Sequence, residues 1–211
     1  MKVLIISTGR TGSSSLIKVL CRCLEYDESF EPYNPIFHVK WPDNAMYKST
    51  RNPHEWPRQF QDNLVCKSII NHRPRDYQKS AYFFHTQLSK QFDKFIIMDR
   101  YNIDDQVKSV SYALNEIDKE GYNWHHPYIS DDTIEINKDA RKVLLKSKYD
   151  IKRLSDRLNV PISFYEDIFG KDETKLKQLF QMWDLPNLDF QTFKSSLDKT
   201  QKYSHKKKWI L

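Results

Sequence analysis

Short runs of consecutive apolar residues alternate along the chain with longer stretches in which apolar residues recur at helical spacing. Four runs have the length and composition of strands buried on both faces: residues 2–7, 62–70, 92–100 and 160–167. Helical spacing follows in the segments 13–24, 77–92, 102–119, 140–158, 173–183 and 190–197. This alternation predicts a single α/β domain over residues 1–211, with a mostly parallel central sheet flanked by helices on both faces.

Two local patterns refine this prediction. Residues 30–42 contain three prolines and four aromatic residues without a steady period, so we expect a loop there, with at most one short strand. Asn102, with Asp105 three residues later, has the pattern of an N-cap pair at the start of a helix. Because ligands of open α/β sheets bind at the carboxyl ends of the strands, the segments that follow the strands are the candidates for chemistry.

Charge and cysteine content narrow the setting of the protein. The 34 basic and 28 acidic residues leave a net charge of +6, which favours an anionic ligand such as a nucleotide, an acidic glycan or a nucleic acid. Three cysteines match neither a disulfide framework nor a zinc site, so we expect reduced thiols. No apolar run approaches the ~20 residues that cross a bilayer, and no signal peptide is recognised. These patterns predict a cytoplasmic protein without a membrane anchor.

The segment "STGRTGSSS", residues 7–15, joins the first strand to the first helix. A loop that enters a helix N-terminus presents unpaired backbone N–H groups and the positive end of the helix dipole to an anion. Arg10 adds a full positive charge, and Ser13, Ser14 and Ser15 add hydroxyl donors. The segment therefore predicts a phosphate-binding loop; the alternative is a strand-to-helix turn that binds no ligand.

Two common nucleotide loops do not match this segment. A triphosphate loop needs G-x-x-x-x-G-K-[ST], whereas Gly9 and Gly12 lie only three positions apart and are followed by Ser13. The dinucleotide pattern G-x-G-x-x-G is absent as well. The sequence therefore disfavours a kinase or a nucleoside triphosphatase.

The segment "RTGSS", from Arg10 to Ser14, resembles the 5'-phosphosulfate loop of sulfotransferases that use 3'-phosphoadenosine 5'-phosphosulfate (PAPS). The carbohydrate-type and small soluble bacterial members are the most similar. Residues 95–113 resemble the 3'-phosphate element of the family, with Arg100 at a strand end and Ser109 on the next helix. Residues 162–186 are similar to its "YED" strand end and the helix that follows. The chain departs from the family at Tyr101, where many members continue "RDP", and its Arg-to-Ser spacing is nine rather than eight.

This resemblance implies a three-layer P-loop-like fold and a sulfotransferase that converts PAPS to 3'-phosphoadenosine 5'-phosphate (PAP) without a metal ion. The acceptor would be a hydroxyl or amine of a glycan or small metabolite, and no nucleic-acid partner is expected. Tyr165 would touch the adenine, and Arg10 would stabilise the leaving phosphate. The implied nucleotide contacts are Arg10, Thr11, Gly12, Ser13, Ser14, Ser15, Arg100, Ser109 and Tyr165.

An acceptor hydroxyl needs a general base within hydrogen-bond reach, and two residues are candidates. Glu31, in "FEPYNP", occupies the position of a similar "EP" motif in carbohydrate-type members. His72, in "NHRP", is similar to the "H-x-P" histidine of cytosolic sulfotransferases. We favour Glu31 because the phosphate loop is of the carbohydrate type. Lys67 is a further candidate for contacting the bridging oxygen; the alternative is a strand lysine that extends to solvent.

Two other classes of function remain open. A nucleic-acid-binding module would also use the positive charge and the aromatic residues. However, basic residues are spread along the chain and interleaved with acidic ones, rather than gathered in a stripe. The second alternative is a nucleotide kinase or another P-loop nucleotide-binding protein, whose activity would depend on magnesium and ATP.

Overall fold

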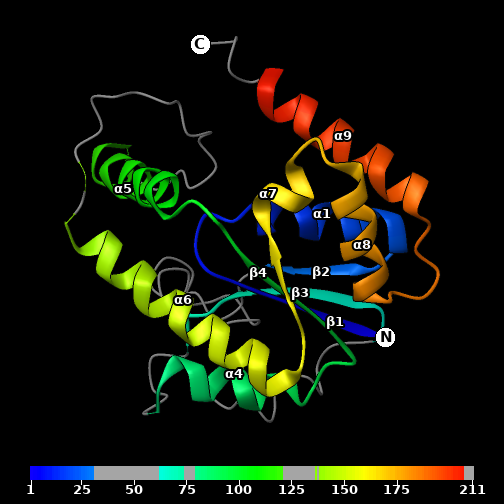
Figure 1. The fold of residues 1–211 in the computed structure, drawn as a ribbon, viewed down its shortest axis with the longest axis horizontal. Coiled ribbons are helices and arrows are strands. Elements are labelled where there is room, and N and C mark those ends of the chain that lie inside the picture. Colours follow the sequence, from blue (N-terminus) through cyan, green and yellow to red (C-terminus); the bar gives the residue numbers. More distant parts are fainter. Residues whose placement is uncertain (31–61, 74–78, 121–135, 137, 207–211) are drawn as a thin grey trace.

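The computed structural model describes residues 1–30, 62–73, 79–120, 136 and 138–206 (Figure 1). At its centre lies a five-stranded sheet with the order β2-β3-β1-β4-β5, in which each neighbouring pair is parallel. The strands are β1 (Lys2–Ser7), β2 (Asp27–Phe30), β3 (Leu64–Ile69), β4 (Lys94–Asp99) and β5 (Ile162–Phe164). The described helices are α1 (Ser13–Leu24), α4 (Ala81–Ser89), α5 (Ile103–Glu120), α6 (Lys138–Leu158), α7 (Tyr165–Phe169), α8 (Glu173–Trp183) and α9 (Phe190–Lys206).

The central strand β1 shows how the sequence builds three layers. Its side chains alternate between the two faces, as in any strand. Val3 and Ile5 pack with α1, α8 and α9, whereas Leu4 and Ile6 pack with α4 and α6. Figure 1 shows these two groups of helices on opposite sides of the strands. The predicted α/β fold with a parallel sheet and helices on both faces is therefore confirmed.

Helix α5 follows β4 and packs on α6 rather than on the sheet. Val107 of α5 forms a small buried cluster with Ala140 and Leu144 of α6. The start of α5 is fixed by Asn102, whose Oδ1 accepts hydrogen bonds from the N–H groups of Asp104 at 3.0 Å and Asp105 at 3.1 Å. The predicted N-cap is thus confirmed. It fixes the first turn of α5 and therefore which of the following residues share one face of the helix.

Three elements differ from the sequence prediction. The expected strand 160–167 ends at Phe164, and Tyr165 begins α7, because acidic residues in a first turn stabilise a helix N-terminus. The strand β2, "DESF", was missed because it is short and partly polar and carries no apolar run. The last helix extends to Lys206, beyond the predicted end at residue 197.

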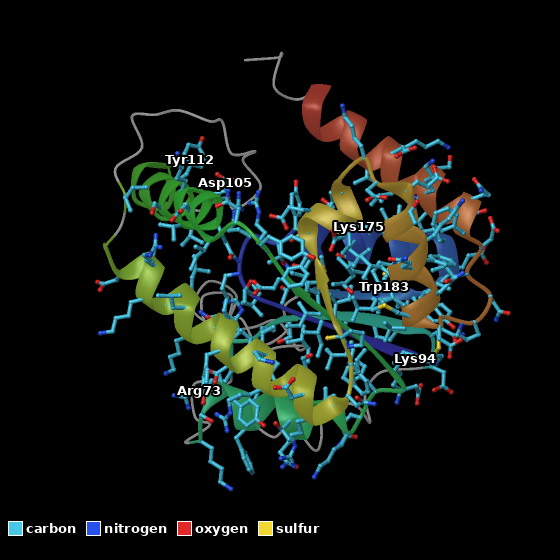
Figure 2. All side chains as sticks on the ribbon, in the orientation of Figure 1. Arg73, Lys94, Asp105, Tyr112, Lys175 and Trp183 are labelled. Atoms are coloured by element: carbon cyan, nitrogen blue, oxygen red, sulfur yellow. The ribbon has the colours of Figure 1, made fainter. Side chains whose placement is uncertain are left out.

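The structure also describes the three cysteines and the apolar character of the helices. Cys21, Cys23 and Cys66 are free thiols. Among the described helices, none has both the length and the apolar composition needed to span a bilayer. Trp183, at the end of α8, is 5% exposed and donates a hydrogen bond from Nε1 to Ser163 Oγ at 2.9 Å, which ties α8 to the edge strand β5 (Figure 2).

Candidate functional site

The loop between β1 and α1 forms the centre of the candidate site. Arg10 and Gly12 both have left-handed backbone conformations, with φ of 62° and 73°. A positive φ is unfavourable for arginine, and such strain is concentrated at functional sites. Gly12 is the N-cap of α1, and its carbonyl accepts the N–H groups of Ser15 and Leu16. The first N–H groups of α1 and the positive end of its dipole therefore face the loop.

The loop hydroxyl groups fall into two sets. Thr11 is fully buried and donates to the carbonyl of Thr8 at 3.2 Å, while Ser13 is 4% exposed and accepts from Ser7 Oγ at 3.0 Å. Their side chains are therefore used within the protein, and a ligand would meet their backbone N–H groups. Ser14 and Ser15 are only partly buried, so their hydroxyl groups are the ones that a ligand could reach.

Helix α7 explains why residue 12 is glycine. A Cβ atom at this position would lie 2.6 Å from Phe169 Cε2 and 2.9 Å from Tyr165 Cδ2, well inside van der Waals contact. The rings of Phe169 and Tyr165 contact each other, with centroids 4.9 Å apart. Tyr165, predicted as an adenine contact at a strand end, thus lies at the start of a helix and against the loop between β1 and α1.

Two arginines from distant parts of the chain lie at this loop: Arg10 belongs to it, and Arg100 lies over the Tyr165 ring that packs against Gly12. Arg10 Nε donates to Ser109 Oγ at 2.8 Å, and Ser109 is 3% exposed on α5. The pKa of Arg10 is lowered, chiefly by burial and then by the positive charge of Arg100. Because like charges that are taken out of water destabilise each other, this pair favours the binding of an anion between or beside them.

Arg100 itself lies among residues of α7. Its Nε is 3.5 Å from Glu166 Oε1, and its guanidinium carbon is 4.5 Å from the centre of the Tyr165 ring. Glu166 is held in turn by the backbone N–H of Tyr101 at 3.0 Å. Among the described ion pairs, Glu166 is therefore the partner of Arg100.

Lys67 brings a further positive charge to the loop from the opposite side. It lies near the end of β3, is 2% exposed, and its Nζ donates to Ser14 Oγ at 2.8 Å. A lysine that extends to solvent is therefore excluded. The loop lacks a lysine of its own, and the neighbouring strand supplies one.

Of the two candidate general bases, the structure describes His72. His72 follows β3, is partly buried, and its N–H bonds to the carbonyl of Ile69 at 2.8 Å. It is close enough to the buried His85 for its charge to contribute to a lowered pKa there, although burial is the larger cause. Glu31 lies outside the described residues.

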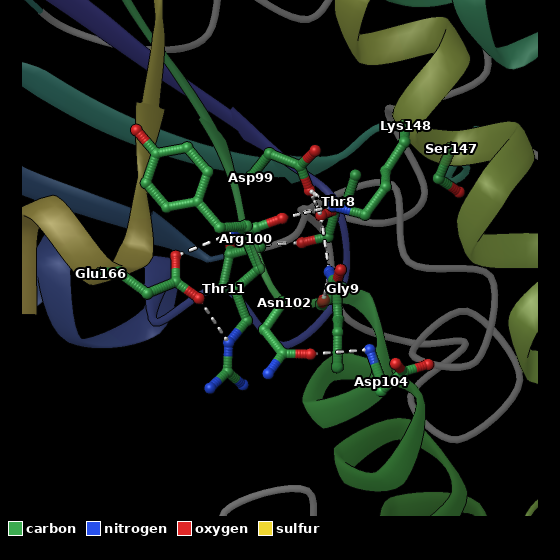
Figure 3. Close-up of polar contacts among 12 residues, drawn as sticks. Thr8, Gly9, Thr11, Asp99, Arg100, Asn102, Asp104, Ser147, Lys148 and Glu166 are labelled. Carbon is green, nitrogen blue, oxygen red and sulfur yellow. Dashed lines mark hydrogen bonds and ion pairs between the residues drawn. The ribbon is translucent and has the colours of Figure 1, made fainter.

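Sequence reasoning missed a buried polar network below the loop (Figure 3). Asp99 Oδ1 accepts hydrogen bonds from Thr8 Oγ1 and from Lys148 Nζ, each at 2.8 Å. Gln106 Nε2 donates to Thr8 Oγ1 at 2.8 Å and to the carbonyl of Gly9 at 2.6 Å. The only sequence signal for Asp99 was its position directly after an apolar run, at the end of a predicted buried strand. Nothing in the sequence indicated Gln106 or Lys148.

The site therefore joins a helix N-terminus, two arginines, a buried lysine and serine hydroxyl groups at the carboxyl edge of the sheet. These groups can bind an anion with more than one charged part. In the part of the chain that the structure describes, no group of three or more histidine, cysteine or acidic side chains is placed to hold a metal ion. No protein-family model matches the chain, and no curated protein matches it.

Proposed function

We propose that the protein is a PAPS-dependent sulfotransferase, which transfers a sulfuryl group to a hydroxyl or amine of a glycan or small metabolite. One arrangement carries the proposal: Arg10 of the loop donates to Ser109, and Arg100 after β4 lies over the Tyr165 ring, which packs against Gly12 of the same loop. A nucleotide with phosphate groups on both sides of one ribose needs two neighbouring cationic sites. Guanidinium groups suit both sites because they bind phosphate oxygens bidentately.

The residues divide between the two ends of such a nucleotide. The N-terminus of α1, Ser14, Ser15 and Lys67 surround the place for the 5'-phosphosulfate. Arg100 and Ser109 would bind the 3'-phosphate, and Arg10 of the loop donates a hydrogen bond to Ser109. Arg10 is therefore close to both ends, and the sequence resemblance alone had assigned it to the 5' end.

In sulfuryl transfer the acceptor oxygen bonds to sulfur while the bond from sulfur to the bridging phosphate oxygen breaks, and the electron pair of that bond remains on the 5'-phosphate of PAP. Preorganised donors that meet the developing charge supply much of the catalysis in such reactions. The ammonium group of Lys67 and the loop N–H groups would stabilise the charge on the leaving phosphate. The acceptor proton goes to the general base, which is Glu31 or His72.

A nucleotide kinase is the second candidate, and Lys67 is the observation that favours it. Its ammonium group provides the loop with the lysine charge that a triphosphate site uses. A kinase also needs a carboxylate for magnesium, and Asp99 is the acidic residue at the end of the neighbouring strand β4. Oδ1 of Asp99 already accepts from Thr8 and Lys148, which makes Asp99 a poor magnesium ligand. We therefore rank the kinase below the sulfotransferase.

Thermal shift measurements with PAP, AMP and ATP, with and without magnesium, test the proposal. A ligand that binds only the folded state at 100 times its Kd adds about 2.7 kcal/mol of stability. For a chain of this length, that raises the Tm by roughly 5–10 °C. We expect this rise with PAP and a much smaller one with AMP. Stabilisation by ATP only when magnesium is present would favour the kinase, and equal or absent shifts would overturn the sulfotransferase proposal.

The choice of base needs a separate experiment, which measures PAPS turnover by the variants Glu31→Ala and His72→Ala. If Glu31 is the base, its removal lowers kcat while PAP affinity stays near that of the wild type, since a base acts on the acceptor and not on the nucleotide. Wild-type turnover in Glu31→Ala together with lost turnover in His72→Ala would reverse the order of the two candidates.

A further inference from the structure

We propose that the ion pair of Asp99 and Lys148, together with Gln106, holds the phosphate loop and Arg100 at the spacing of one bisphosphorylated nucleotide, and so determines selectivity for PAP over AMP. This inference rests on the proposed function, because it concerns how that site recognises both ends of its nucleotide. The three residues touch no ligand in this scheme. They are positioning residues that act through Thr8, Gly9 and Arg100.

Lys148 is the residue that joins the two sides. Its Nζ donates to Asp99 Oδ1 at 2.8 Å and to the backbone carbonyl of Arg100 at 2.5 Å. The side chains of Lys148 and Asp99 are 19% and 8% exposed, so water competes little for these bonds. One ammonium group on α6 therefore fixes both the carboxylate before Arg100 and the backbone of Arg100 itself (Figure 3).

Asp99 connects this ammonium group to the loop. The same Oδ1 that accepts from Lys148 accepts from Thr8 Oγ1 at 2.8 Å, and Thr8 is fully buried. Thr8 is also linked to β4 through its backbone N–H, which bonds to the carbonyl of Met98 at 3.3 Å. The start of the loop is thus attached to the end of β4 by a backbone bond and by a charge-assisted side-chain bond.

Gln106 completes the attachment from α5. It is fully buried, and its amide group donates to Thr8 Oγ1 at 2.8 Å and to the Gly9 carbonyl at 2.6 Å. Ser109 lies three residues further along α5 and therefore on the same face of the helix. The same helix face holds the loop backbone through Gln106 and contacts the Arg10 side chain through Ser109.

The position of these bonds explains why they affect recognition. Bidentate contacts between arginine and phosphate depend steeply on geometry, and a displacement of about 1 Å can reduce function about 100-fold. PAP engages both the loop and Arg100, so a change in their separation weakens its binding. AMP lacks the 3'-phosphate and uses the loop alone, so its binding is little affected. A pair that served stability alone would not distinguish the two nucleotides.

The test compares the dissociation constants of PAP and AMP, measured by titration calorimetry, in the wild type and in Lys148→Met, Asp99→Asn and Lys148→Arg. We expect the ratio of the two constants to fall about tenfold or more in Lys148→Met and Asp99→Asn, mainly through weaker PAP binding. Lys148→Arg keeps the charge and should recover part of the ratio. The matched control is Lys152→Met, one turn along α6, because Lys152 is 72% exposed and pairs only with Asp156 among the described ion pairs. It should keep the wild-type ratio.

The outcomes separate this inference from the proposed function. A wild-type protein that does not prefer PAP over AMP would overturn the proposed function, and the inference with it. A wild-type protein that prefers PAP, with variants that keep the same ratio, would overturn the inference alone. If Lys148→Met does not fold, the nearly isosteric Asp99→Asn gives the same readout, since it removes the charge and retains the size.

Discussion

Replacement of Gly12 by alanine tests the observation that backbone conformation and close packing both require glycine in the loop between β1 and α1. The φ of Gly12 is 73°, and a Cβ atom would lie 2.6 Å and 2.9 Å from ring atoms of Phe169 and Tyr165. The left-handed conformation costs a residue with a Cβ about 1–2 kcal/mol. Overpacking against the two rings adds about 1–3 kcal/mol. We therefore expect Gly12→Ala to lower the free energy of unfolding by about 3 kcal/mol.

Gly9→Ala is the matched control, because it adds the same methyl group to the same loop. No heavy atom lies within 4 Å of a Cβ at Gly9, and its φ is not in the left-handed region. The expected change in the free energy of unfolding is below about 0.5 kcal/mol. Urea titrations of the wild type and the two variants measure the difference. Thermal melts should show a fall in Tm of roughly 6–12 °C for Gly12→Ala.

The outcome that would refute this reasoning is equal stability of the two variants. If Gly12→Ala and Gly9→Ala unfold within about 0.5 kcal/mol of each other, then α7 does not pack closely over the loop as the structure describes. Because Gly12 is also the N-cap of α1, PAP affinity provides a second readout. A shift of Gly12 that widens the loop should weaken PAP binding in parallel with the loss of stability.

Three further predictions concern other parts of the chain. Burial lowers the pKa of His85 to about 4, so this histidine stabilises the fold fully above pH 6.5 and loses that contribution as the pH falls towards 4. Urea titrations should show the stability difference between wild type and His85→Asn shrinking by about 2–3 kcal/mol from pH 7 to 4.5. Parallel pH curves of the two proteins would contradict this. Lys67→Met should weaken PAP binding about 10- to 100-fold in calorimetry, because a charge-assisted donor is lost from the loop, whereas exposed Lys90→Met should not. Ser80→Ala should lower stability in urea titrations by about 1 kcal/mol, since Ser80 Oγ accepts from the N–H of Phe83 at the start of α4, and Ser80→Asp should retain most of it.

Sequence pattern predicted the elements of the fold where burial has a period. Strands β1, β3 and β4 are apolar runs buried on both faces, and α5, α6 and α8 begin and end within two residues of the prediction. The pattern failed at β2 and at the end of β5, where short edge segments carry polar residues and no run of apolar ones. In such segments the sheet neighbours decide the structure, rather than the local sequence.

The sequence by itself determined that a glycine- and serine-rich loop with Arg10 enters a helix, and that Arg100 and Ser109 follow a buried strand. Tertiary structure alone decided which of these residues meet. The strand order places β1 between β3 and β4, so Lys67 reaches the loop from one side and Asp99 from the other. Contacts such as Arg10 with Ser109 join residues 99 positions apart. Local periodicity carries information about which face of an element is buried, whereas side-chain pairs across the sheet depend on strand order, register and the packing of whole helices.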